Sequence, residues 1–258
     1  MTDALKAAGL DMIICAQTTA AFETLEGYKY MTAYAVEDHL SSLEKIARLA
    51  KELGAIHVNA HSGCDSWSVA EAREYLRGAL LIEAEVGIEI CHETHRKRIF
   101  WNPFNFREII KGDASLAKIK VNLDISHWVV CLERIFATPS SEQENGPVDG
   151  WWPEVLDLLK HHVFMMHTRI GYGAGPQVPD PAAPEYQNEV TAHMGWWSEI
   201  MKAQIKQGKV CFCEPEHGPW PYQQSVPNTG MKPTHDIWEA NNYVAKLIRE
   251  EWPNICKA

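Results

Sequence analysis

The sequence predicts an α/β protein whose parallel strands close into a barrel. Short apolar segments alternate with longer segments in which apolar residues recur at helical spacing, and repeated strand–helix units of this kind build parallel sheets. A barrel gathers the carboxyl ends of all its strands around one mouth, whereas an open sheet uses only one or two loops. The barrel is favoured here because almost every apolar segment ends in a polar residue able to bind a metal or a substrate: Gln17, His61, Glu93, Asp124 with His127, His167 with Arg169, and Glu214 with Glu216.

Six strands are expected from the apolar segments. Near-continuous apolar sequences such as VFMM and VCFC are typical of parallel strands buried on both faces. No glycine-rich nucleotide-binding motif follows the first segment, which removes the usual reason to expect an open sheet. The expected strands span residues 12–17, 56–61, 87–93, 121–127, 163–170 and 210–216.

Helices are expected between these strands and at both ends of the chain. In the segment 36–54, Leu40, Leu43 and Ile46 follow helical spacing, and Gly54 is a stop signal. The other expected helices span residues 2–9, 68–87, 151–162, 191–208 and 235–252. Two long loops, 171–188 and 217–234, follow the last two strands, and loops of this length in a compact domain are typically lids or binding loops.

Composition excludes several classes of function. The chain has 258 residues and a net charge of −10, with no stretch rich in Lys and Arg, which argues against a nucleic-acid-binding protein. No apolar stretch approaches the ~20 residues that span a bilayer, and the first residues do not read as a signal peptide. Seven cysteines without regular spacing are typical of a reduced protein. We therefore expect a cytoplasmic protein with no nucleic-acid or membrane partner.

A metal site is expected from four residues that end four consecutive predicted strands: Glu93, Asp124, His167 and Glu216. Three carboxylates and one imidazole suit Mn²⁺, Mg²⁺, Co²⁺ or Zn²⁺, and the oxygen-rich set favours Mn²⁺ or Mg²⁺. Several carboxylates buried together without a cation would be costly. A structural polar network is the alternative. Glu214 has the same strand parity as Glu216, so either acid could face the mouth.

Four motifs in this order resemble the xylose isomerase-like barrels, the sugar phosphate isomerase/epimerase group: HETH (92–95), LDISH (123–127), MHTR (166–169) and EPEHGPWPY (214–222). The resemblance implies that Glu93, Asp124, His167 and Glu216 bind one divalent metal, with Mn²⁺ expected first. It also implies that His127, in the DxxH motif, contacts substrate. The EPEHGP string is similar to a TPEFGP string in which only the second acid exists, which favours Glu216 over Glu214.

The resemblance also gives a strand count. If the strand near Glu216 is the eighth of a barrel, the segment 12–17 is the third, so strands one and two are not found. We therefore expect one domain, 1–258, that is short at its N-terminus compared with the family. Uncovered strand edges invite pairing, so helix 235–252 and the long loops, or a second copy of the chain, are expected to cover them.

Further residues are candidates for substrate binding. His61 ends the fourth strand in the family's count, at a place where members contact substrate. Trp67 and Trp128 follow predicted strands, where an aromatic face could stack on a sugar ring. Arg169 could bind a carboxylate or phosphate through two hydrogen bonds, and a structural salt bridge is an equal alternative.

The metal site and the resemblance together predict an isomerase or epimerase of a small sugar or polyol. A divalent cation that binds a carbonyl and the adjacent hydroxyl acidifies the C–H bond and stabilises a cis-enediolate, while Glu93 and Glu216 take and return the proton. A lyase of the same fold, acting on a keto-polyol or keto-glycoside, shares this first step and is the main alternative. A metal-dependent hydrolase or nuclease, or a non-catalytic sugar-binding barrel, is less favoured. The sequence does not identify the sugar.

Overall fold

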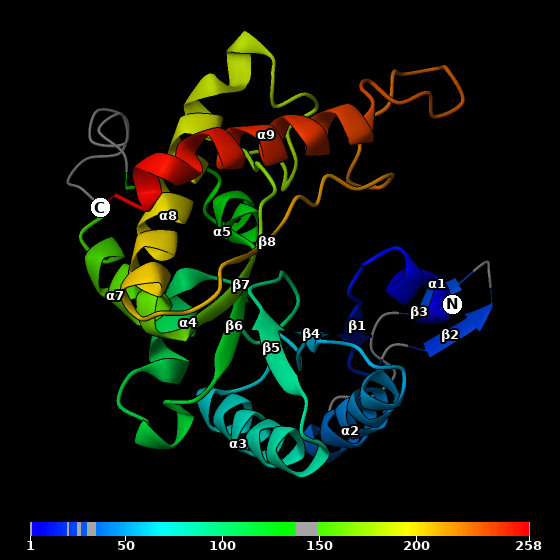
Figure 1. Cartoon of the computed structure of the whole chain (residues 1–258), viewed down its shortest axis with the longest axis vertical. Coiled ribbons are helices and arrows are strands. Elements are labelled where there is room, and N and C mark those ends of the chain that lie inside the picture. The colour runs from blue at the N-terminus through cyan, green and yellow to red at the C-terminus, as the bar shows by residue number, and fades with distance from the viewer. Residues whose placement is uncertain (1, 20, 25–26, 30–34, 138–148, 258) are drawn as a thin grey trace. The chain divides into compact units, whose positions relative to one another are not determined.

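The computed structural model describes residues 2–19, 21–24, 27–29, 35–137 and 149–257. Contacts between residues divide the chain into two compact units, residues 1–122 and 123–258. The boundary falls within a strand, so each unit carries its own part of the sheet (Figure 1). The prediction of a single domain over 1–258 stays a prediction.

The first unit alternates strands and helices. Parallel pairing joins β1 to β4, β4 to β5, and β5 to β6, while β2 and β3 form a separate antiparallel pair. Its elements are α1 (Thr2–Ala7), β1 (Ile13–Gln17), β2 (Ala21–Thr24), β3 (Gly27–Lys29), α2 (Val36–Glu52), β4 (His57–His61), α3 (Val69–Val86), β5 (Glu89–Glu93), α4 (Pro103–Ile110), the 3₁₀ turn η1 (Ala114–Leu116) and β6 (Lys120–Leu123).

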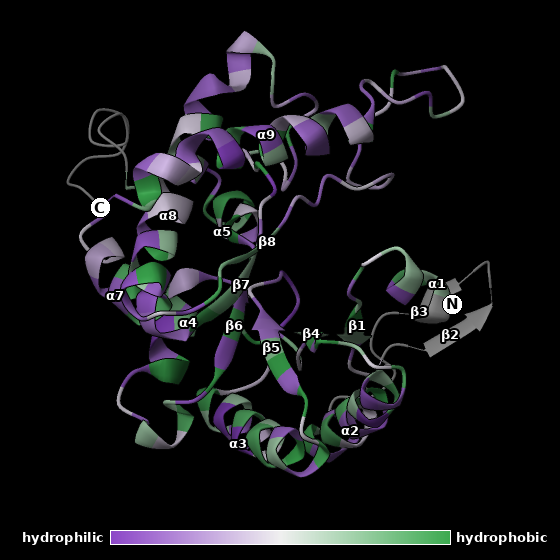
Figure 2. Ribbon diagram, viewed as in Figure 1, coloured by the Kyte–Doolittle hydropathy of each residue, from purple (hydrophilic) through white to green (hydrophobic). Residues whose placement is uncertain are grey.

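Helix α3 shows how local sequence sets the ends of these elements. The Ser68 hydroxyl accepts the backbone N–H of Glu71, whose carboxylate accepts the backbone N–H of Ser68, a reciprocal cap that satisfies two otherwise unpaired donors. Gly87 ends the helix in the left-handed region, at φ 69°, where glycine carries no steric penalty. Hydrophobic and hydrophilic segments alternate along α2 and α3 (Figure 2). The apolar side of α3, including Tyr75 and Leu76, is buried.

Register brings the polar ends of two strands to one edge in the first unit. Ala60 of β4 lies opposite His92 of β5, and Glu93 lies opposite Asn122 of β6. His61 and Glu93 are the last residues of their strands. Both therefore lie at the carboxyl edge of the sheet, the edge that carries ligands in parallel α/β proteins.

The second unit continues the alternation. Strands β7 and β8 pair in parallel, with His167 opposite Glu214. Its core includes an aromatic cluster, in which the Phe136 and Trp196 rings stack with centroids 4.5 Å apart. Its elements are α5 (Ile125–Leu132), α7 (Trp152–His162), β7 (Val163–His167), the 3₁₀ turn η2 (Pro184–Tyr186), α8 (Gln187–Lys206), β8 (Phe212–Glu214) and α9 (Ile237–Ile255).

The expected fold class is confirmed: the protein is α/β, with parallel strands alternating with helices in the order β1-β4-β5-β6-β7-β8. The expected count of six parallel strands holds within the described residues. The helices α1, α2, α3, α7, α8 and α9 were all expected. The hairpin β2–β3 and the helices α4 and α5 were not.

Three predicted strands extend too far. The strand expected over 163–170 ends at His167. The strand expected over 121–127 ends at Leu123, because the Asp124 carboxylate accepts the backbone N–H of Ser126 and thereby starts helix α5. His127 consequently lies on a helix. The strand expected over 210–216 is limited to Phe212–Glu214, so Glu216 lies in the loop after it. The argument that Glu214 and Glu216 share strand parity is therefore wrong.

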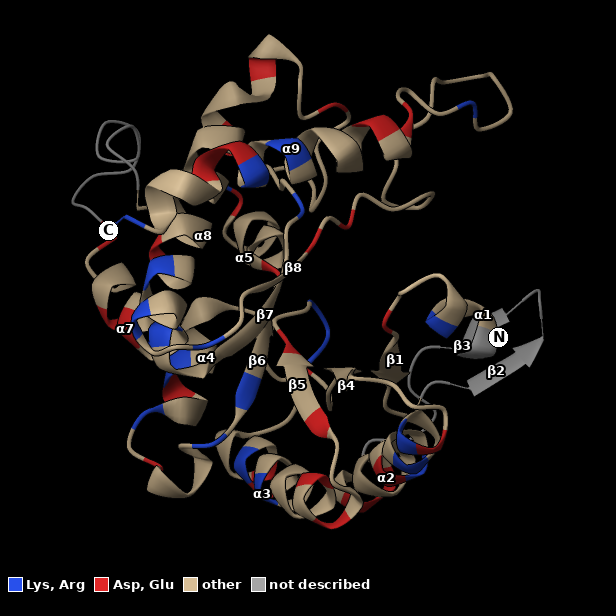
Figure 3. Cartoon of the chain, viewed as in Figure 1, with Lys and Arg blue, Asp and Glu red and all other residues tan. Residues whose placement is uncertain are grey.

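The distribution of surface charge and the length of the helices are relevant to nucleic-acid and membrane partners. Basic and acidic residues are interspersed along α2, α3 and α9 (Figure 3). Among the described residues, no helix is long and apolar enough to cross a membrane. The expected absence of nucleic-acid partners and the expected second copy both stay predictions.

Candidate metal centre

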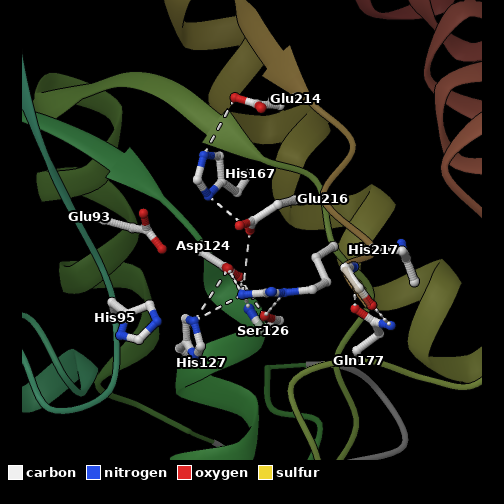
Figure 4. Close-up of polar contacts among 12 residues, drawn as sticks. Glu93, His95, Asp124, Ser126, His127, His167, Gln177, Glu214, Glu216 and His217 are labelled. Carbon is white, nitrogen blue, oxygen red and sulfur yellow. Dashed lines mark hydrogen bonds and ion pairs between the residues drawn. The ribbon is translucent and has the colours of Figure 1, made fainter. Parts of the chain in front are cut away.

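Three of the four predicted metal ligands come together in the second unit. Asp124 is the N-cap of α5, His167 ends β7, and Glu216 lies two residues after β8. One ligand atom from each lies within 4.8 Å of the others. Figure 4 shows the three side chains directed toward one another. Residues far apart in the sequence thus form one group because they follow the carboxyl ends of successive strands.

His167 lies between two acids. Its Nδ1 is 2.9 Å from Glu216 Oε2, and its Nε2 is 3.6 Å from Glu214 Oε2. Ligand atoms about 2.1 Å from a common ion are themselves roughly 3 Å apart, which matches the spacing to Glu216. The Glu216 side chain is also the less exposed of the two, at 34% against 50%. The geometry favours Glu216 over Glu214 as a ligand.

Asp124 is fully buried, and its two oxygens have different partners. Oδ1 accepts hydrogen bonds from the backbone N–H and the hydroxyl of Ser126. Oδ2 accepts a hydrogen bond from the Arg169 guanidinium and lies 3.6 Å from His127 Nε2. The hydrogen bonds from Ser126 orient the Asp124 carboxylate, and Oδ2 is the oxygen directed at the guanidinium of Arg169.

Arg169 is the central cation of this cluster. Its side chain is buried, donates to His127 Nε2 at 2.9 Å and to Ser126 Oγ at 3.2 Å, and lies 3.4 Å from Glu216 Oε2. The face of Tyr222 covers it, with the guanidinium carbon 4.8 Å from the ring centroid. Arg169 therefore forms the structural salt bridge expected as one of its two alternatives. Its expected contact with a substrate anion stays a prediction.

The charge balance of the cluster leaves room for another cation. Asp124 and Glu216 carry two negative charges, and Arg169 supplies one positive charge. Buried carboxylates that outnumber their cations are unfavourable, so a divalent ion would fit this donor set of one imidazole and two carboxylates.

The remaining predicted residues are all buried or largely buried. Glu93 and His61 are in the first unit, where His61 Nε2 is 2.8 Å from Glu93 Oε2 and Glu93 is buried. His127 Nε2 accepts a hydrogen bond from the Arg169 guanidinium. Trp128 has no exposed surface, and Trp67 packs edge-on against His39 with centroids 4.8 Å apart. The structure gives the expected sugar-stacking role of these two tryptophans no support.

No protein-family model matches the sequence, and no curated protein matches it. Solved structures do match. The sugar phosphate isomerase/epimerase from Parabacteroides distasonis ATCC 8503 aligns with a TM-score of 0.50 at 12% identity, over 96% of this chain and 79% of that one. The chain therefore has the fold of that sugar phosphate isomerase/epimerase.

Two other xylose isomerase-like structures are somewhat less similar. Endonuclease IV from Thermus thermophilus aligns with a TM-score of 0.48 at 16% identity, over 98% of this chain and 80% of that one. A xylose isomerase-like TIM barrel protein from Mycobacterium smegmatis, solved in complex with magnesium, has the same TM-score and identity over 96% of this chain and 76% of that one. The likeness to each of these structures concerns the fold alone.

Sequence reasoning missed His217, the residue after Glu216. Its side chain is 3% exposed, and neither ring nitrogen has a hydrogen-bond partner among the described residues. Burial, together with the charge of Arg169, lowers the pKa of His217 to about 3, so the ring is neutral at pH 7. Asn241 of α9 fixes its backbone, accepting from its N–H at 2.7 Å and donating to its carbonyl at 2.9 Å. The only sequence signal for His217 was the string HGP directly after Glu216.

Proposed function

We propose that this protein is a metal-dependent isomerase or epimerase of a small sugar or polyol that works through a cis-enediolate. The observation that carries the proposal is the convergence of Asp124, His167 and Glu216 in the second unit. Two carboxylates and an imidazole in a largely buried cluster form a donor set for a divalent cation, with Mn²⁺ favoured over Mg²⁺, Co²⁺ or Zn²⁺.

Glu93 is proposed as the fourth ligand. Pairing within the first unit supports this, since Glu93 lies opposite Asn122 and the next residue, Thr94, donates its N–H to the Asn122 carbonyl at 3.0 Å. Asn122 precedes Asp124 by two residues in the chain. Two strand ends in this register bring their following side chains to the same edge, and Glu93 adds a third carboxylate to the set.

The metal, when bound, would polarise a substrate carbonyl and stabilise the negative charge that develops on its oxygen. The carboxylates of Glu93 and Glu216 then serve as the bases that take the proton from the neighbouring carbon and return it. Glu216 suits this part because about a third of its side chain remains exposed. Arg169, 3.4 Å from Glu216, orients that carboxylate, and Asp124 remains buried.

Contacts between the two long loops, 171–188 and 217–234, support a reaction from which water is excluded. Gln177 of the first loop donates to the carbonyl of Gly218 at 3.0 Å and accepts its N–H at 2.8 Å. Gln224 of the second loop donates to the Tyr172 hydroxyl. The loops are thus tied to each other beside Glu216, where they would shield an enediolate from protonation by solvent.

The proposal is tested by metal content and proton exchange. Protein stripped with chelator and reloaded with Mn²⁺ should hold metal and catalyse deuterium uptake from D₂O at the carbon next to the carbonyl of a ketose in a panel of sugars. Asp124→Asn should lose the ion bound by Asp124 and the exchange while keeping its fold, whereas Asp157→Asn, at an exposed position on α7, should keep both. Exchange with loss of water would indicate the lyase instead. An active Asp124→Asn variant at limiting metal, or a metal-loaded protein with no exchange on any ketose, would reject the proposal.

A further inference from the structure

A second group of potential ligands lies wholly within the first unit. It comprises His61 at the end of β4, Glu93 at the end of β5, and His95 two residues later. One ligand atom from each lies within 4.8 Å of the others. Figure 4 shows the side chains of Glu93 and His95 next to each other. The chemistry proposed above uses Glu93 but neither histidine.

One carboxylate oxygen organises the group. Glu93 Oε2 lies 2.8 Å from His61 Nε2 and accepts a hydrogen bond from Asn59 Nδ2 at 2.6 Å. The His61 and His95 rings stack, with centroids 4.4 Å apart and planes 29° apart. Two imidazoles and one carboxylate thus face the same small region at the sheet edge.

The orientation of His95 suits a ligand. Its Nδ1 lies at hydrogen-bond distance from the carbonyl oxygen of Arg96, which can only accept, so Nδ1 carries the proton. In the neutral ring the lone pair then belongs to Nε2. Metal-binding histidines usually donate their second ring N–H to a carbonyl or carboxylate in this way, which fixes the ring and its tautomer.

Arg98 is a basic side chain of the first unit whose charge acts on Glu93. Arg98 is buried and close enough to Glu93 to feel its charge, but its hydrogen bonds go to the carbonyl oxygens of Thr18 and Gly63, at 3.3 and 3.1 Å. Asn59 is also buried, and its Oδ1 has no hydrogen-bond partner among the described residues. A water held by an ion is a donor that such an acceptor can use.

We propose that His61, Glu93 and His95 bind a second divalent cation, of the zinc class. Two histidines and one glutamate form a donor set of catalytic zinc sites, which hold a water in the fourth position. The His61 side chain is 14% exposed, so the site is open to an ion from solvent. His61 is then a ligand rather than the substrate contact expected from the sequence. Glu93 supplies one oxygen to each ion, so the two sites share a residue but neither requires the other.

Metal counting on the full chain tests this inference. Chelator-stripped protein is equilibrated with excess Zn²⁺, passed through a desalting column, and assayed for bound metal by mass spectrometry. Wild-type protein should hold two ions per chain, and His95→Ala should hold one. His161→Ala removes an exposed imidazole on α7 and should still hold two. His95 is only half buried, so its loss should leave the melting temperature of the stripped protein nearly unchanged.

The combined variants separate the two sites. Asp124→Asn should retain one ion, and Asp124→Asn combined with His95→Ala should retain none. Wild-type protein with a single ion that is lost in Asp124→Asn but kept in His95→Ala would overturn the second site and leave the first standing. A single ion lost in His95→Ala but kept in Asp124→Asn would support the second site and reject the first. Wild-type protein that binds no ion would reject both.

Discussion

Arg169 shows at the scale of one residue how the candidate centre balances its charges. Its guanidinium donates a hydrogen bond to Asp124 and lies 3.4 Å from Glu216, so one positive side chain contacts both acids. Removal of one partner from a buried ion pair typically costs about 3–5 kcal/mol, because the remaining charge is left uncompensated. A divalent ion on the same carboxylates would offset that loss.

We therefore expect Arg169→Ala to lower the free energy of unfolding strongly in chelator and much less in excess Mn²⁺. Its metal affinity should rise, since a competing cation has been removed from the ligands. Urea unfolding with and without metal measures the first effect, and calorimetric titration the second. Arg249→Ala, at an exposed position on α9, serves as the control. Equal destabilisation with and without Mn²⁺ would show that no ion shares these carboxylates.

The sequence identified Asp124, His167 and Glu216 because each follows an apolar segment, and position after a strand is visible in a sequence. It did not reveal what surrounds them. The contacts of Arg169 with Asp124 and His127, and the buried ring of His217, depend on where loops fold back, which no periodicity encodes. Resemblance to a motif chose Glu216 over Glu214, and the distances to His167 favour the same residue for a geometric reason.

At the scale of elements, helix α8 fixes the start of the first long loop through one histidine. His193 is fully buried, its Nδ1 lies 2.8 Å from the Glu189 carbonyl, and its Nε2 accepts the N–H of Gly171 at 3.1 Å. Burial lowers the pKa of His193 from 6.5 to about 4, so the neutral ring holds the loop. Gly171 must approach closely, because a Cβ there would lie 2.9 Å from the Ser126 Cα.

Protonation of His193 should therefore weaken the fold in acid. Between pH 6.5 and 4 the unfolded histidine binds a proton that the folded one does not, so its contribution to stability is present above pH 6.5 and falls as the pH drops to about 4. The loss is on the order of 3 kcal/mol for this shift. Unfolding free energies measured from pH 7 to 4 should decline more steeply in wild-type protein than in His193→Gln. Parallel profiles for the two proteins would contradict this account.

Element ends were harder to predict than the elements themselves. Helix α4 carries a recognisable start, since the Asn102 side chain accepts the N–H of Asn105 and Pro103 occupies the first turn, but its eight residues were too few for a convincing periodicity. Asp124 was assigned to a strand expected over 121–127. The hydrogen bond from the Ser126 N–H to the Asp124 carboxylate starts a helix there instead. Whether such a cap forms depends on tertiary contacts as much as on the local sequence.

For the whole molecule, the alternation of strands and helices was enough to predict the parallel sheet and its strand order, because both follow from repeated right-handed crossovers. The hairpin β2–β3 was not foreseen. Its strands have four and three residues, too short for an alternating pattern to stand out.

If one ion is held by Glu93 from the first unit and by three residues from the second, it should couple the stability of both units. Calorimetric scans with Mn²⁺ at about a hundred times its dissociation constant should show a gain of about 2.7 kcal/mol spread over the whole transition. The gain should vanish in Asp124→Asn. If Mn²⁺ shifts the melting of only one unit, Glu93 is not a ligand of that ion.

The paired hydrogen bonds between Asn241 and the backbone of His217 tie the last helix to the residue that follows Glu216. The amide of Asn241 occupies the donor and acceptor next to Glu216, so a shift of α9 along its axis would be transmitted to that carboxylate. Under the proposed function, substitutions on the buried side of α9, such as at Val244 or Ile248, should alter metal affinity without touching a ligand. Helix α9 should then count among the elements that tune the proposed reaction, alongside the loops that surround it.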